Sequence, residues 1–177
     1  MKKILSLIII FVTFIFIYFL QANFFVWFNI AGVKPNLFII LALFIGLFIG
    51  KIYGISIGII LGMGLDFFIG KSIGISAIML GIVGFLGGYL DKSFSKESRI
   101  TMITMIGIAT IIYELGVILL NYFINKAQIG ILYIIINLII ELIYNTILTI
   151  IIYPLIIKFG YRIGENFKEN KILTRYF

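Results

Sequence analysis

Acidic side chains inside apolar segments are the residues of this sequence best suited to chemistry. Asp66, Glu114 and Glu141 each lie within, or at the edge of, a long run of apolar residues. A charge at the centre of a bilayer costs about 2.5 to 3.5 kcal/mol even on the most lenient scale, so acids there are usually paired or functional. These three side chains are therefore the first candidates for a site.

Polar residues spaced by four or seven place two of these acids on polar helix faces. One face lies in the segment 131–156 and comprises Asn137, Glu141, Asn145 and Thr149. The other lies in the segment 100–124 and comprises Thr110, Glu114 and Asn121. Two such faces on consecutive helices predict one shared polar interior. Either Glu114 and Glu141 merely hold the helices together by hydrogen bonds, or they line a pocket for a ligand or a partner helix; the sequence favours neither.

Asp66 need not be a functional acid. It lies near the end of a predicted helix, where it can be a solvated loop residue or a helix cap. The stretch from Gly62 to Asp66 distantly resembles the Gly-x-Gly-Asp pattern of intramembrane aspartyl proteases, but its spacing differs by one residue. A second membrane-embedded aspartate is also missing, and catalysis by a carboxylate pair needs both acids. Protease activity is therefore not expected.

The sequence contains no cysteine and no histidine. This excludes thiolate nucleophiles, imidazole bases and the two commonest ligands of transition metals. No glycine-rich phosphate-binding loop of the Walker type is present either. We expect no catalytic residue, no cofactor, no metal and no nucleic-acid partner, and we attribute the net charge of +7 to membrane topology.

The elements that must position these residues are membrane-spanning helices. Of the 177 residues, 63% are hydrophobic and 12% are charged. In soluble domains roughly half of the residues are apolar and roughly a quarter are charged. With roughly 20 residues needed per crossing, the chain allows about six helices. We predict a single all-α transmembrane domain, a bundle with helices at about 4–20, 37–50, 52–68, 73–90, 100–124 and 131–156, followed by a cytoplasmic basic tail at 157–177.

Basic residues predict the orientation. When six helices cross alternately, eleven lysines and arginines fall on one side, and only Lys34, Lys71 and Lys126 fall on the other. Basic loops stay in the cytoplasm, so both termini are expected inside a multi-pass protein of the bacterial cytoplasmic membrane. The lipid bilayer is then the first partner of this chain.

Glycines at every fourth position, from Gly46 to Gly62, form one face over the second and third predicted helices. Small residues let helix backbones approach closely in a membrane. The simpler interpretation is packing among the second, third and fourth helices. The alternative is a face that is reserved for another protein.

Three short motifs resemble the MreD family of bacterial rod-shape-determining membrane proteins. They are Lys34-Pro35-Asn36-Leu37-Phe38, the stretch from Gly58 to Gly74 with Asp66 followed by two spaced glycines, and Asn145-Thr146-Ile147-Leu148 followed by Tyr153-Pro154. The resemblance covers essentially the whole chain. The residues that match the family pattern are Pro35, Asn36, Asp66, Gly70, Gly74, Asn145 and Pro154.

The resemblance implies a non-enzymatic scaffold of the cell-elongation, or rod, complex that helps to organise peptidoglycan synthesis. It implies MreC as the first partner, then the actin-like MreB, the glycosyltransferase RodA and a class B penicillin-binding protein. The scaffold hypothesis predicts that Gly62→Leu or Gly74→Leu weakens copurification with MreC, while the helix face that meets each partner is left open. The sequence leaves open whether the chain also forms a homo-oligomer.

The resemblance also implies a fold like that of the substrate-binding S-components of energy-coupling-factor vitamin transporters. The alternative function is therefore a substrate-binding membrane subunit of a small-molecule transporter. Those subunits use a small-residue motif on their first helix to meet the coupling subunit. Here the segment 4–20 consists mainly of isoleucine, phenylalanine and leucine, which disfavours this alternative.

Overall fold

The computed structural model describes residues 2–69, 73–90, 98–126 and 130–167 of the chain. Within them it is all-helical, as the sequence predicts. The elements are α1 (Lys2–Phe19), a π-helical turn η1 (Leu20–Phe24), α2 (Leu37–Ile49), α3 (Lys51–Ile69), α4 (Ile75–Leu90), α5 (Arg99–Asn125) and α6 (Ile131–Phe167).

Four helical segments are long and apolar enough to cross a membrane: α1 with η1, α3, α5 and α6. The apolar helices α2 and α4 are shorter, with 13 and 16 residues. At about 1.5 Å per residue, α2 is roughly 20 Å long, which is less than a hydrocarbon core of about 30 Å. A helix this short is suited to the interior of the bundle, where other helices and not lipid surround it.

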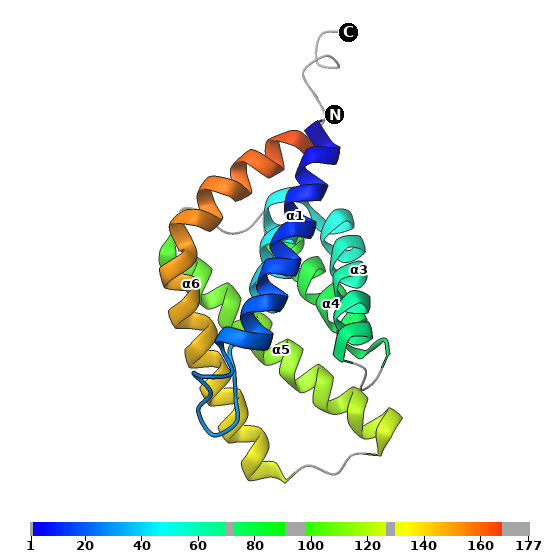
Figure 1. The fold of residues 1–177 in the computed structure, drawn as a ribbon, viewed down its shortest axis with the longest axis vertical. Helices are drawn as coiled ribbons and strands as arrows, with labels where there is room; N and C mark the ends of the chain where they lie inside the picture. Colours follow the sequence, from blue (N-terminus) through cyan, green and yellow to red (C-terminus); the bar gives the residue numbers. More distant parts are fainter. Residues whose placement is uncertain (1, 70–72, 91–97, 127–129, 168–177) are drawn as a thin grey trace, which may run out of the picture.

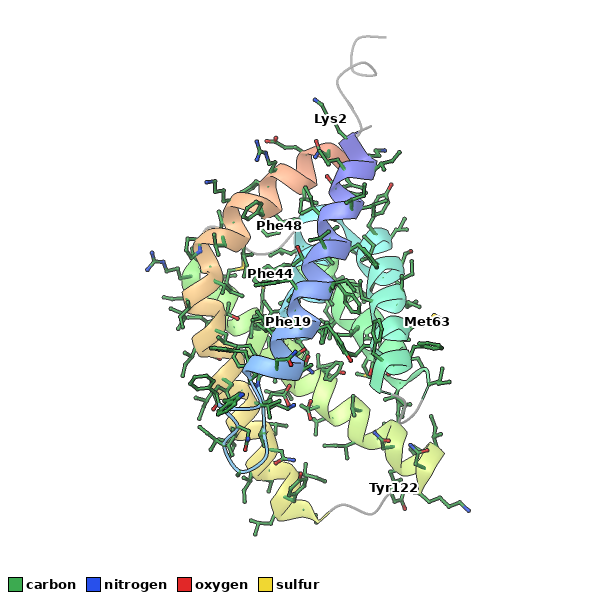
Figure 2. All side chains as sticks on the ribbon, in the orientation of Figure 1. Lys2, Phe19, Phe44, Phe48, Met63 and Tyr122 are labelled. Carbon is green, nitrogen blue, oxygen red and sulfur yellow. The ribbon has the colours of Figure 1, made fainter. Side chains whose placement is uncertain are left out.

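The core of the bundle forms around α2, which contacts α1, α3, α4, α5 and α6. Eleven of its residues are buried, on every side of the helix. This fits an apolar sequence without a polar face, which is typical of a fully enclosed helix. Figure 2 shows two of its side chains, Phe44 and Phe48, between the ribbons of α1 and α6.

Glycine faces bring α2, α3 and α4 into backbone contact. A Cβ atom on Gly46 or Gly54 would overlap the backbone of Gly84 on α4, and one on Gly58 would overlap the backbone of Leu80. Gly62 is equally close to Ser76 and Ala77. These glycines therefore serve the packing of three helices within the chain, which is the simpler of the two interpretations of their spacing.

The sixth helix is longer than the sequence predicts. It has 37 residues and ends at Phe167, so residues 157–167 are helical, and Pro154 lies inside the helix. The predicted end near residue 156 was wrong, because Gly160 and Gly164 pack directly against Phe48 and hold this part onto α2. The missing N–H of a proline bends a helix without necessarily ending it, and Figure 1 shows the last part of α6 crossing the end of the bundle. The rest of the predicted tail, residues 168–177, lies outside the described residues.

Both ends of the described chain lie at the same end of the bundle (Figure 1). The amide Nδ2 of Asn166 on α6 donates a hydrogen bond of 2.8 Å to Oγ of Ser6 on α1. Ser6 is fully buried by this contact. An even number of crossings would produce this arrangement.

At the opposite end, the second half of α5 and the first half of α6 diverge and project beyond the other helices (Figure 1). Tyr122, labelled in Figure 2, lies near the tip of α5. Large apolar side chains in these halves are exposed, among them Leu115, Leu119, Ile135 and Ile139. We refer to residues 115–125 and 131–139 as the projecting halves.

The packing of Gly62 can be tested with a single methyl group. We expect Gly62→Ala to lower the thermal stability of the detergent-solubilised protein, because overpacking costs about 1–3 kcal/mol and the contacted atoms belong to the backbone. Gly107→Ala is the matched control, since a Cβ there meets nothing within 4 Å and glycine to alanine in a helix gains roughly 0.5–1 kcal/mol. The fraction of each variant that stays soluble after heating, measured by size-exclusion chromatography, gives its thermal stability. Equal stability of Gly62→Ala and Gly107→Ala would contradict the close packing at Gly62.

Candidate functional site

Asp66 caps the beginning of α4. Its carboxylate accepts hydrogen bonds from the backbone N–H groups of Gly74 (2.8 Å), Ser76 (3.2 Å) and Ala77 (3.3 Å). The first N–H groups of a helix have no partner within the helix, and a negative charge there is favoured by the helix dipole. Asp66 is only 4% exposed, so it is a buried cap and not a solvated loop residue.

Gly74 is needed for this cap because of its backbone conformation. Its φ angle is +103°, and a Cβ atom added there would meet no other atom within 4 Å. Side-chain-bearing residues rarely adopt such an angle. Gly74 thus turns the chain so that its own N–H points at Asp66.

Asn145 joins three parts of the bundle. Its Oδ1 accepts a hydrogen bond of 2.8 Å from the backbone N–H of Asn36, which directly precedes α2. Its Nδ2 donates to Oγ1 of Thr110 on α5 at 3.1 Å. Thr149, one turn further along α6, donates its hydroxyl to the backbone oxygen of Asn145. Asn145, Thr110 and Thr149 are all fully enclosed.

The segment between η1 and α2 is fastened to its neighbours by side chains. Nε2 of Gln21 donates to the backbone oxygen of Pro35 at 2.7 Å, and the hydroxyl of Tyr144 on α6 donates to the backbone oxygen of Phe28. Pro35 is fully buried. Together with the bond from Asn36 to Asn145, these contacts hold the segment against η1 and α6.

A cavity of about 470 Å³ lies beside these contacts. It is bounded by the end of α1 with η1, the segment before α2, and parts of α2 to α6. Its lining consists of Tyr18, Gln21, Ala22, Gly32, Val33, Lys34, Pro35, Asn36, Phe38, Leu65, Ser76, Tyr113, Glu114, Asn137 and Glu141.

Both predicted intramembrane acids, Glu114 and Glu141, line this cavity. Their carboxyl groups lie next to each other, and the side chains of Asn36 and Asn145 adjoin that of Glu141. Glu141 is 7% exposed. In the described part of the chain, no group of three or more His, Cys, Asp or Glu residues is placed to hold a metal ion. The arrangement is suited to binding through carboxyl and amide oxygens.

Residues 1–163 match the family model for the rod shape-determining protein MreD. The chain belongs to the MreD family. It is therefore a rod-shape-determining membrane protein, as its motifs predict. No curated protein and no solved structure matches the chain, so the likeness to transporter S-components stays a prediction.

The structure joins motif residues in two pairs, one between two motifs and one within a single motif. Asn36 bonds to Asn145, and Asp66 bonds to Gly74. Pro154 is exposed, away from both pairs, at the bend of α6. Gly70 lies outside the described residues. The motifs that carry the resemblance thus serve helix starts and helix junctions.

Two sequence-based expectations about the site need correction. Asn121 does not line the cavity; its Nδ2 donates to the backbone oxygen of Val117 on its own helix. Gly62 is covered by α4 and offers no free face. Conversely, Gln21 and Tyr113 line the cavity but were not predicted. Both had a signal in the sequence, because Gln21 is a polar residue directly after an apolar run and Tyr113 directly precedes the candidate acid Glu114.

The capping role of Asp66 predicts a loss of stability in Asp66→Asn. The asparagine offers one acceptor oxygen where two are used, and its amide nitrogen would face an N–H donor. We expect a loss of about 1–3 kcal/mol, the usual cost of an unsatisfied buried donor. Thermal unfolding in detergent measures it. Glu165→Gln, which changes an exposed acid of α6, should unfold like the parent protein.

A pair of asparagine variants tests the junction at Asn145. We expect Asn145→Leu to destabilise the protein by about 1–3 kcal/mol, because the N–H of Asn36 and the hydroxyl of Thr110 lose their partner. Asn121→Leu should have little effect, since Asn121 bonds only within α5. If the unfolding curves of Asn145→Leu and Asn121→Leu coincide, Asn145 does not join the helices.

Proposed function

We propose that this protein is a non-enzymatic scaffold of the rod complex, which binds MreC and helps to organise peptidoglycan synthesis. Membership of the MreD family over residues 1–163 carries the proposal. Further partners in this proposal are MreB, RodA and a class B penicillin-binding protein. The proposed location is the bacterial cytoplasmic membrane, with both termini in the cytoplasm, in agreement with the distribution of lysine and arginine.

The projecting halves of α5 and α6 are the proposed contact surface for the transmembrane part of MreC. The glycine faces are occupied within the chain, since Gly46, Gly54 and Gly62 all touch α4. In the projecting halves, large apolar side chains such as Leu119 and Ile135 are exposed. A further transmembrane helix that packed here could contact exposed apolar side chains of two helices at once.

A substrate-binding subunit of a transporter is the second candidate, and the cavity of about 470 Å³ is the observation in its favour. Pockets for small molecules are typically about 300–1,000 Å³. Against it, the outer side of α1 exposes Leu5, Ile8 and Phe11, among other large residues, so it has no small-residue face for a coupling subunit.

Affinity purification from mild detergent tests the scaffold. The tagged protein, expressed in a rod-shaped bacterium in place of its counterpart, is expected to maintain cell shape and to recover MreC together with cell-wall synthases. Recovery of an ATPase module and its coupling subunit, without MreC, would contradict the scaffold and favour the transporter.

Cysteine cross-linking then locates the contact surface. The natural chain has no cysteine, so each introduced thiol reports one position without background. We expect Leu119→Cys and Ile135→Cys to form disulfides with cysteines placed along the transmembrane helix of MreC. Ile8→Cys, on the exposed side of α1, is the matched control, and cross-links from Ile8→Cys alone would move the contact to α1.

A further inference from the structure

Four buried oxygen atoms have no hydrogen-bond partner among the described residues: Oε1 of Gln21, Oδ1 of Asn36, Oδ1 of Asn137 and Oε1 of Glu141. All four residues line the same cavity. They come from η1, the residue before α2, and two successive turns of α6. Unpaired acceptors that converge from separate elements on one space are the feature on which this inference rests.

These atoms require a donor and not an acceptor. Buried polar atoms in native proteins are nearly always hydrogen-bonded, and each one left unpaired is costly. The amide of Gln21 is oriented by its own bond, because Nε2 donates to Pro35, which leaves Oε1 as the free acceptor. Glu141 is more than nine-tenths buried, and its side chain has no donor of its own when ionised.

The charge of the cavity favours a cationic donor. Glu114 and Glu141 lie side by side in its wall, and the basic residue in the lining, Lys34, is on an exposed part of the chain. Lys34 makes no hydrogen bond to any of the four oxygens. A buried carboxylate gains most from a partner that is both charged and able to donate hydrogen bonds.

The size and the apolar part of the lining favour an organic cation over a bare ion. Tyr18, Phe38, Leu65 and Tyr113 offer aromatic and aliphatic surface beside the oxygens. A bare ion would leave most of the volume without a contact. Aromatic faces also attract cations and cover alkyl groups.

We propose that this cavity binds a primary ammonium group carried by an organic molecule, with the carboxyl groups of Glu141 and Glu114 and the amide oxygens of Gln21, Asn36 and Asn137 as acceptors. The ammonium belongs either to the ethanolamine headgroup of a lipid or to a free amine. Its three N–H donors can pair with three of the four unpaired oxygens at a time. The proposal is independent of MreC binding, because the cavity lies within one chain.

Native mass spectrometry of the full-length protein in detergent tests the proposal. One arm offers equal amounts of dioleoyl phosphatidylethanolamine and dioleoyl phosphatidylcholine, which differ in that the choline group has no N–H donor. The other arm titrates hexylamine. We expect the parent protein to prefer the ethanolamine lipid or to bind hexylamine; the first result assigns the ammonium to a lipid and the second to a free amine.

Glu141→Gln keeps the size of the side chain and removes its charge. Its affinity for the bound probe should fall at least about tenfold, as expected for the loss of a charge-assisted hydrogen bond. Glu165→Gln makes the same change at an exposed position on the same helix and should bind like the parent. Equal affinity in Glu141→Gln and Glu165→Gln would overturn the proposal, and so would a parent protein that neither prefers the ethanolamine lipid nor binds hexylamine.

Asn137→Leu is the second variant, for use if Glu141→Gln does not fold. Asn137 is partly exposed and its Oδ1 has no partner, so its removal should leave the fold intact. We expect it to weaken binding of the same probe about threefold or more, in line with one lost hydrogen bond. Unchanged binding in a folded Asn137→Leu protein would likewise overturn the proposal.

Discussion

Pairing of backbone N–H groups at the starts of the two short helices α2 and α4 is the constraint on which the bundle depends. Such groups find no water inside a membrane protein, and leaving them unpaired is costly. At α2, Oδ1 of Asn145 accepts from the N–H of Asn36. At α4, the carboxylate of Asp66 accepts from three N–H groups. Each acceptor comes from a different helix, so the same bonds that finish a helix also fix its position against a neighbour.

The remaining architecture follows from these two junctions. Once α2 and α4 begin at fixed points, their glycines allow α2, α3 and α4 to approach to backbone contact. The longer helices α1, α5 and α6 then surround α2 and present large apolar side chains outward. Because the segment before α2 must reach Asn145, it passes between α1 and α6, and the cavity lies beside its path.

In this member of the MreD family, the motif residues Asn36, Asp66, Gly74 and Asn145 build the junctions. The acids Glu114 and Glu141, which lie outside the motifs, face the cavity, and the side chain of Asn36 also lines it. The scaffold and the ammonium site that we propose use different surfaces, the projecting halves and the cavity. Both can therefore operate in the same protein.

The sequence by itself determined the all-helical class, the number of helices and the inward face of α6. Apolar segment length is a local property, and the spacing of four from Glu141 to Thr149 places these residues on one face whatever surrounds the helix. Only the tertiary structure decided which partners these residues meet, because Asn36 and Asn145 are far apart in the chain. It also decided where α6 ends: Pro154 suggests a stop, but contacts of Gly160 and Gly164 with Phe48 hold the helix together beyond it. The cavity was likewise beyond sequence reasoning, since its walls come from every helix of the bundle and depend on how closely those helices approach.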